Sequence, residues 1–130
     1  MTSVVLDASA LIALLRSEPG AEVVRKSLAG AVISAVNFSE VLKKTIERGG
    51  PVATAVSRID ALSISIIPFG ERHAAAAAEL YPQAKPHGLS FADRACIALG
   101  LEQRATVLTT DGKWKLLNIP LKLKLIRNDH

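Results

Sequence analysis

The chain has 130 residues, 49% of them hydrophobic, which suits one domain with a substantial hydrophobic core. Its single cysteine, Cys96, excludes a disulfide framework and a cysteine-based zinc site, and favours a reducing, cytoplasmic environment. The formal net charge of +4 lies entirely in residues 112–130, a pattern that suits a polyanionic partner but is also typical of a solvated basic tail.

Short apolar runs alternate with segments of helical periodicity along the chain. The runs predicted to form strands are residues 3–6, 31–34, 63–69, 106–108 and 121–126. The segments predicted to form helices are residues 8–16, 19–28, 37–48, 51–62, 73–80 and 90–104, with a loop at 81–88 and a short helical turn at 111–117. Such alternation requires right-handed crossovers, so it predicts an α/β fold in which a parallel sheet of four to five strands is flanked by helices.

The sequence predicts a single domain over residues 1–130. No internal repeat, linker or low-complexity segment divides the chain. The N-terminus lacks the basic region and apolar stretch of a signal peptide, and no window approaches the roughly 20 uncharged residues of a membrane span. We therefore expect a soluble, cytoplasmic protein.

Four acidic residues follow apolar runs or begin the next helices: Asp7, Glu40, Asp93 and Asp111. The carboxyl ends of parallel strands meet at one edge of a sheet, so carboxylates far apart in sequence can converge there. Each acid is also a plausible helix cap, and both Asn37-x-x-Glu40 and Ser90-x-x-Asp93 fit the capping-box pattern. Capping does not explain four acids at one edge, because neighbouring carboxylates repel unless a cation compensates them.

A cluster of carboxylates without a suitable histidine or cysteine favours Mg²⁺ or Mn²⁺ over zinc. Such an ion can activate water and stabilise the leaving oxygen of a phosphodiester. Metal-free RNA cleavage by two histidines is an alternative, but His73, His87 and His130 lie in unrelated segments. Trp114 could stack a base, yet the chain has only five aromatic residues and no aromatic–basic interleaving, which favours core packing.

Four short motifs surround the acids, in this order: Val5-Leu6-Asp7-Ala8-Ser9, Asn37-x-x-Glu40-Val41, Gly88-Leu89-Ser90-x-Ala92-Asp93 and Leu108-Thr109-x-Asp111-x-x-Trp114. Together they resemble the PIN domain, and within that family they look most like the VapC toxins of VapBC-type toxin–antitoxin modules. The resemblance covers nearly the whole chain. It implies a Mg²⁺- or Mn²⁺-dependent endoribonuclease that hydrolyses RNA with a metal-activated water and leaves a 5′-phosphate. It also implies a homodimer that is silenced by a cognate VapB-like antitoxin, whose C-terminal segment lies over the active site.

The same resemblance assigns roles to individual residues. The four acids match the family's catalytic, metal-binding quartet, and three further residues match its supporting positions: Ser9, Asn37 and Thr109. The cations expected to hold RNA are Arg94, Lys113, Lys115, Lys122 and Lys124. Arg94 is alternatively a partner in a surface ion pair. The chain departs from the family at Gly112-Lys113, where an arginine and an alanine are common, and this departure affects the contact with RNA rather than the quartet.

Two other functions remain open at this stage. A housekeeping PIN nuclease would process ribosomal or messenger RNA without an antitoxin. A non-catalytic module would bind RNA or protein on the same fold, although it would have no need for four mutually repelling carboxylates. Five consecutive alanines at residues 74–78 form a flat face, which suits either a dimer interface or packing inside the monomer.

Overall fold

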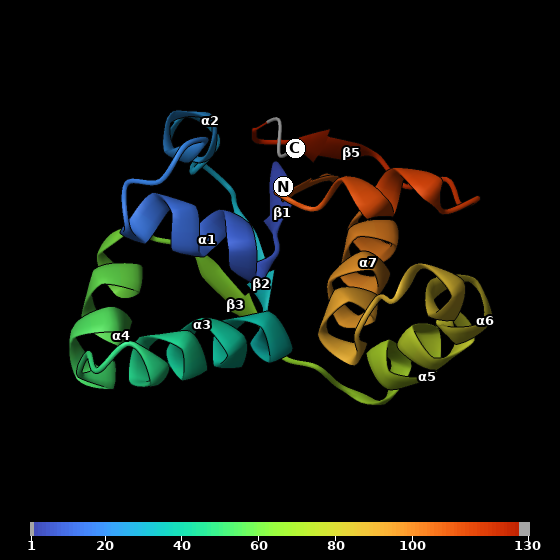
Figure 1. Cartoon of the computed structure of the whole chain (residues 1–130), viewed down its shortest axis with the longest axis horizontal. Helices are drawn as coiled ribbons and strands as arrows, with labels where there is room; N and C mark the ends of the chain where they lie inside the picture. The colour runs from blue at the N-terminus through green and yellow to red at the C-terminus, as the bar shows by residue number, and fades with distance from the viewer. Residues whose placement is uncertain (1, 128–130) are drawn as a thin grey trace.

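The structure, a computed structural model that describes residues 2–127, has three layers, with a parallel sheet between two groups of helices (Figure 1). The strands are β1 (Val4–Leu6), β2 (Val32–Ser34), β3 (Ser65–Ile67), β4 (Thr106–Thr109) and β5 (Leu123–Leu125). The helices are α1 (Ala8–Leu15), α2 (Ala21–Lys26), α3 (Ala35–Glu47), α4 (Val52–Ala61), α5 (Glu71–Glu79), α6 (Tyr81–Ala84) and α7 (Phe91–Gln103). Two 3₁₀ helices, η1 (Lys85–His87) and η2 (Gly112–Leu116), complete the order. The predicted α/β fold with a parallel sheet is confirmed.

The strand order is β3-β2-β1-β4-β5, and every neighbouring pair is parallel. Strand β1 is central, with Val5 opposite Val32 on one side and Val107 on the other. The chain moves outward from β1 in one direction through β2 and β3, and in the other through β4 and β5. This reversal beside β1 is a topological switch point, where sheets of this kind form a crevice outside the carboxyl ends of their strands.

Two hydrophobic cores lie on opposite faces of the sheet, because successive strand residues point to opposite sides. On the first face, Leu6 packs with the helices of the first half of the chain, including Leu11 of α1 and Ile59 of α4. On the second face, Val5 packs with α7 and with Trp114. Helices α1–α4 thus cover one face and α5–α7 the other, with α7 against the switch point (Figure 1).

Helix α3 begins at Ala35, two residues earlier than predicted. Ser34, the last residue of β2, is its N-cap, and the Ser34 hydroxyl accepts the Val36 N–H at 3.2 Å. Asn37 is therefore already inside the first turn, and Glu40 lies further along the helix. The capping box predicted for Asn37 and Glu40 is wrong, because an earlier hydroxyl had already capped the helix.

Residues 81–88 do not form the predicted loop but the short helices α6 and η1. Pro82 and Pro86 lie in the first turns of these helices, where the missing proline N–H leaves no hydrogen bond unmade. Gly88 then ends η1 with a positive φ of 68°. None of the helices within residues 2–127 is long and apolar enough to cross a bilayer.

Candidate active site

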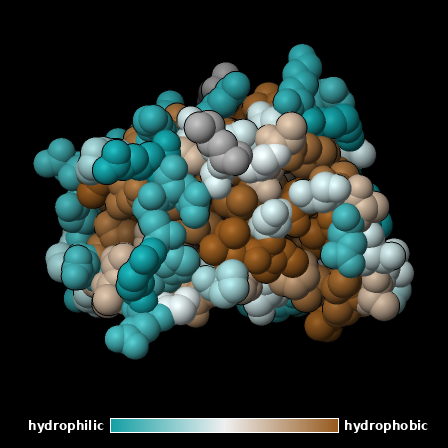
Figure 2. All heavy atoms as spheres, turned by 180° about the vertical axis from the view of Figure 1, so that it is seen from behind, coloured by the Kyte–Doolittle hydropathy of each residue, from teal (hydrophilic) through white to brown (hydrophobic). Residues whose placement is uncertain are grey.

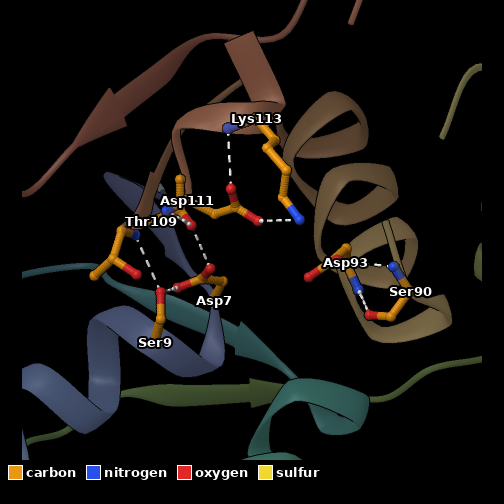
Figure 3. A network of polar contacts seen from close by, with 8 residues as sticks. Asp7, Ser9, Ser90, Asp93, Thr109, Asp111 and Lys113 are labelled. Carbon is orange, nitrogen blue, oxygen red and sulfur yellow. Dashed lines mark hydrogen bonds and ion pairs between the residues drawn. The ribbon is translucent and has the colours of Figure 1, made fainter. Parts of the chain in front are cut away.

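A cavity of about 630 Å³ opens at the carboxyl edge of the sheet, beside the switch point. Its lining includes all four predicted acids: Asp7, Glu40, Asp93 and Asp111. They come from four separate segments of the chain, namely the end of β1, α3, the first turn of α7 and the residue that caps η2. The fold therefore brings the acids to one hollow, as the sequence predicted. Figure 3 shows three of them, Asp7, Asp93 and Asp111, around a common space.

Asp7 is the most buried of the four and has the most hydrogen bonds. It caps α1, and its Oδ1 accepts the Ala10 N–H at 2.8 Å and the Ser9 hydroxyl at 2.7 Å. Its Oδ2 accepts the Thr109 hydroxyl at 2.5 Å. Burial raises the pKa of Asp7 to about 6, although these three hydrogen bonds oppose the shift and the charge of Asp93 adds to it.

Ser9 and Thr109 also fix the neighbouring end of β4. The Thr109 hydroxyl accepts the Asp111 N–H at 3.1 Å, and the Ser9 hydroxyl accepts the Thr110 N–H at 3.1 Å. Each hydroxyl thus donates to Asp7 and accepts from the loop that carries Asp111. Ser9 and Thr109, two of the predicted supporting residues, are both in contact with Asp7, and they couple the β1 end to the β4 end.

Asn37 joins the helix of Glu40 to the helix of Asp93. Its amide group is buried, and Nδ2 donates to the Ala92 carbonyl of α7 at 3.0 Å and lies 3.4 Å from Glu40 Oε1. Burial raises the pKa of Glu40, the Asn37 contact lowers it, and the charge of Asp93 raises it. The predicted supporting residue therefore holds the spacing between two of the four acids.

The capping box predicted for Ser90 and Asp93 is confirmed. Asp93 Oδ2 accepts the Ser90 N–H at 2.8 Å, and the Ser90 hydroxyl accepts the Asp93 N–H at 3.1 Å (Figure 3). Burial raises the pKa of Asp93, the contacts with Ser90 lower it, and the charge of Asp111 raises it. Asp93 therefore both completes the capping box of α7 and belongs to the group of acids that line the cavity.

Asp111 has a local cation as its partner. It caps η2, its Oδ1 accepts the Lys113 N–H at 2.9 Å, and its Oδ2 lies 3.9 Å from Lys113 Nζ (Figure 3). Lys113, one of the predicted RNA-contacting residues, therefore lines the cavity together with the acids.

The donor set fits a hard divalent cation. It consists of carboxylate oxygens, which Mg²⁺ and Mn²⁺ prefer. Burial raises the pKa of Asp7, Glu40 and Asp93, and the charge of a neighbouring acid adds to each shift. A cation would offset that charge. As they stand, no three acidic, histidine or cysteine side chains within residues 2–127 are gathered tightly enough to hold an ion. One oxygen of Asp93 accepts from Ser90, and Asp111 contacts Lys113.

The remaining predicted cations lie elsewhere. Lys115, Lys122 and Lys124 are exposed and are not part of the cavity lining, and Lys122 Nζ lies 3.4 Å from the Arg104 carbonyl. The cavity instead has a second lysine that the sequence analysis missed, Lys44 of α3. The spacing of Lys44 from Glu40 is one that places two helical residues on the same face, and this signal could have identified it.

Arg94 does not line the cavity, and it has no acidic partner among residues 2–127. Its Nη1 donates to the Ala77 carbonyl of α5 at 2.8 Å. Its guanidinium carbon lies 5.4 Å from the centre of the Tyr81 ring and 5.6 Å from that of the Phe91 ring. Arg94 therefore links α7 to α5 and α6.

Trp114, Cys96 and His73, which were considered for other chemistry, are buried or contact other residues of the fold. Trp114 is only 2% exposed, which confirms core packing, and Cys96 is fully buried, where burial raises its thiol pKa. His73 Nε2 lies 2.9 Å from Glu102 Oε1 on the outer side of α7. None of these residues lines the acidic cavity, and neither does His87, while His130 lies outside the described residues.

Several solved structures have this fold. A toxin–antitoxin complex from Klebsiella pneumoniae has a TM-score of 0.74 and 21% identity, covering 98% of this chain and 100% of that chain. DNA-bound VapBC from Salmonella typhimurium has a TM-score of 0.74 and 12% identity, with the same coverage. FitAcB from Neisseria gonorrhoeae has a TM-score of 0.63 and 25% identity, covering 86% of this chain and 91% of that chain.

No curated protein matches the sequence significantly. The sequence profile of the PIN domain, in contrast, matches residues 4–119. This span begins with β1 and extends beyond η2, so it includes all four acids of the cavity together with the strands that position them. The chain therefore belongs to the PIN-domain family.

Proposed function

We propose that this protein is a Mg²⁺- or Mn²⁺-dependent endoribonuclease, the toxin component of a VapBC-type toxin–antitoxin module. The observation that supports it most is the convergence of four acids, from four separate segments, on one cavity of a PIN domain. The similarity to solved VapBC and FitAcB structures supports the toxin assignment. In this proposal the protein hydrolyses RNA phosphodiester bonds and acts in the cytoplasm.

In this proposal the four acids hold the metal ion, and Asp7 has the most rigid position. The ion, when bound, would activate a water molecule and stabilise charge on the phosphodiester. Ser9 and Thr109 orient Asp7 by donating to its two oxygens. Asn37 sets the distance between the helices of Glu40 and Asp93. Lys113 lies beside Asp111 and would contact the substrate phosphates.

The test is cleavage of total RNA by the purified protein with Mg²⁺ or Mn²⁺, in the presence and absence of EDTA. The matched variants are Asp93→Asn, in the cavity, and Asp60→Asn, on the exposed side of α4. We expect discrete fragments with 5′-phosphates from the wild type and Asp60→Asn, and none from Asp93→Asn or with EDTA. Cleavage that persists in a folded Asp93→Asn variant would contradict the assignment of the site.

A toxin and a housekeeping nuclease differ in their effect on the cell. Expression of a toxin should arrest growth, and expression together with a VapB-like antitoxin should relieve the arrest. Growth that continues despite RNA cleavage in vitro would favour the housekeeping nuclease. If no RNA is cleaved and growth continues, the fold is being used as a binding module for RNA or protein.

We also propose a homodimer. In support, apolar side chains gather over the middle of the face opposite to that of Figure 1 (Figure 2). In α5, Ala77 is buried, while Ala74, Ala75 and Ala78 are exposed and leave a flat surface. Sedimentation at micromolar concentration tests the dimer, since a mass of 13.8 kDa would correspond to the monomer.

A further inference from the structure

A second groove lies beside the acidic cavity, between α1, α3 and α4. Its volume is about 210 Å³, and it shares two lining residues, Ile12 and Lys44, with the acidic cavity. The two hollows are therefore adjacent along the surface of α1 and α3. A chain bound in one of them can continue into the other.

Among the residues that the structure describes, the groove is lined by four cations and by no acidic residue. The cations are Arg16, Lys44, Arg48 and Arg58. The side chains of Arg16 and Lys44 are about half exposed, at 53% and 52%. Their acidic neighbours, Glu18 at 3.7 Å and Glu47 at 3.5 Å, are not part of the groove lining. Two of the four cations therefore have an acidic partner outside the groove, while the lining itself is positive and lies beside a cluster of negative charge.

Three of the cations lie on α4 or at the end of α3. Arg58 of α4 donates through Nη2 to the Leu15 carbonyl at the end of α1, at 2.7 Å, so its guanidinium is fixed at the wall of the groove. Lys44 and Arg48 are four residues apart at the end of α3, a spacing that places two side chains on the same face. Because Lys44 also lines the acidic cavity, the cations of the groove begin beside the acids.

The rest of the groove lining is mostly aliphatic, with Leu15 and Val41 among its residues, and within residues 2–127 it contains no aromatic ring. Without a ring, the groove offers no platform for a stacked base. Its cations are suited to the phosphates of a polyanion, which contribute to affinity through the release of counterions. The adjacent acidic cavity, where a phosphodiester is expected to react, favours RNA over an acidic peptide as the occupant.

We propose that the groove between α1, α3 and α4 binds the phosphate backbone of the RNA substrate on one side of the cleavage site. This inference rests on the proposed nuclease function and specifies where its substrate lies. It assigns RNA binding to cations of α1, α3 and α4 rather than to the lysines near the C-terminus. Charge sums along the sequence could not show this, because they do not distinguish the cations that line the groove from the acidic residues, such as Glu18 and Glu47, that lie outside its lining.

The experiment uses the Asp93→Asn variant, so that RNA is bound without being cut. Fluorescence anisotropy of a labelled twelve-nucleotide uridine oligomer gives the affinity at several salt concentrations. Arg16→Gln with Arg48→Gln removes two cations of the groove. Lys26→Gln with Arg72→Gln, on the exposed surfaces of α2 and α5, removes the same charge elsewhere. Arg48→Gln alone is the second variant, in case the pair destabilises the fold.

We call the variant with Arg16→Gln and Arg48→Gln the groove pair, and the variant with Lys26→Gln and Arg72→Gln the control pair. In the groove pair we expect the slope of log affinity against log salt to become shallower by about 1.4, roughly 0.7 for each lost phosphate contact. In Arg48→Gln the change should be about half of that. The control pair should keep the slope of the parent. A slope that stays unchanged in the groove pair would overturn the inference.

A twelve-residue peptide of alternating glutamate and leucine tests the competing occupant. The outcome that contradicts the inference is a variant with Arg16→Gln and Arg48→Gln that no longer binds this peptide but binds RNA with the salt dependence of the parent. The groove would then be a protein-binding site. The experiments distinguish a failure of the proposed nuclease function from a failure of the proposed RNA-binding groove. RNA that binds through the groove but is not cut by the wild type contradicts the nuclease, whereas cutting with an unchanged slope contradicts the groove.

Discussion

The hydroxyl of Thr109 joins the Asp7 carboxylate to the Asp111 backbone: it donates to Asp7 Oδ2 at 2.5 Å and accepts the Asp111 N–H at 3.1 Å. Thr109 is fully buried at the end of β4, and Asp7 is 6% exposed at the end of β1. One hydroxyl therefore satisfies the buried Asp7 and also fixes the loop of Asp111. The position of each acid depends on the same side chain.

Replacing Thr109 by valine should destabilise the protein, because the shape is kept while the hydroxyl is lost. Asp7 loses a donor and the Asp111 N–H loses an acceptor, so we expect the free energy of unfolding to fall by about 1–3 kcal/mol. The pKa of Asp7 should rise further, since the Thr109 hydrogen bond lowers it. Urea denaturation measures the change. Thr109→Ser, which keeps the hydroxyl, should be closer to the wild type, and equal losses in both variants would contradict this explanation.

The metal-free protein should become less stable as the pH rises from about 4 to 7. Burial raises the pKa of Asp7 from 3.8 to about 6, so the folded state retains a proton that the unfolded state has released. Raising the pH removes that proton and lowers the free energy of unfolding by about 3 kcal/mol once the pH exceeds the folded pKa. Denaturation in EDTA at several pH values measures this loss. In Asp7→Asn the loss should be smaller, and a wild type equally stable at pH 4.5 and 7 would contradict the assignment.

Mn²⁺ should raise the thermal midpoint of the wild type at pH 7. An ion that binds only the folded state stabilises it in proportion to the logarithm of its concentration, and here it also removes repulsion among the acids. Differential scanning fluorimetry with increasing Mn²⁺ follows the shift. Asp60→Asn should show the full shift and Asp93→Asn a much smaller one. If the shift is the same in both variants, the ion binds outside the acidic cavity.

Gly100 should not tolerate alanine, because α7 packs closely against β4 at this point. A Cβ at Gly100 would lie 2.3 Å from Val107 Cγ2, well inside contact distance. We expect Gly100→Ala to lower the free energy of unfolding by about 1–3 kcal/mol, and Val107→Ala in the same chain to recover part of the loss. Gly70→Ala is the control, since nothing lies within 4 Å of its Cβ. A neutral Gly100→Ala would show that α7 can move away from the sheet.

Arg94→Lys should affect stability rather than RNA binding. The planar guanidinium contacts the rings of Tyr81 and Phe91 and donates to the Ala77 carbonyl, and an ammonium group cannot reproduce these contacts. We expect a loss of about 1 kcal/mol of stability, from the cation–π contacts and the hydrogen bond. The salt dependence of RNA affinity should stay unchanged. A shallower salt slope in this variant would instead assign Arg94 to the RNA surface.

Much of the fold could be predicted because the pattern of β1 is unambiguous. Val4, Val5 and Leu6 are all apolar, as expected for a strand that is covered on both faces, and Asp7 follows at once. The alternation of such runs with helical segments implies parallel strands, and parallel strands place their carboxyl ends together. The convergence of the acids therefore followed from the topology.

Features that depend on packing between distant segments could not be predicted. The start of α3 depended on which of two capping residues, Ser34 or Asn37, is used, and Asn37 is instead buried against the Ala92 carbonyl. The surroundings of Arg94 depended on the rings that α6 and α7 bring to it. Local sequence does not encode either contact.

Ser34 is both the last residue of β2 and the N-cap of α3, so no loop separates the strand from the helix. The sheet therefore sets the rotation of α3 about its own axis, and Glu40 points into the cavity as a result of its residue count from Ser34. Inserting one alanine between them would turn the carboxylate by about 100° around the helix and carry it out of the site. The number of residues between Ser34 and Glu40 therefore matters for the site as well as their identity, of which the buried Asn37 is the clearest case.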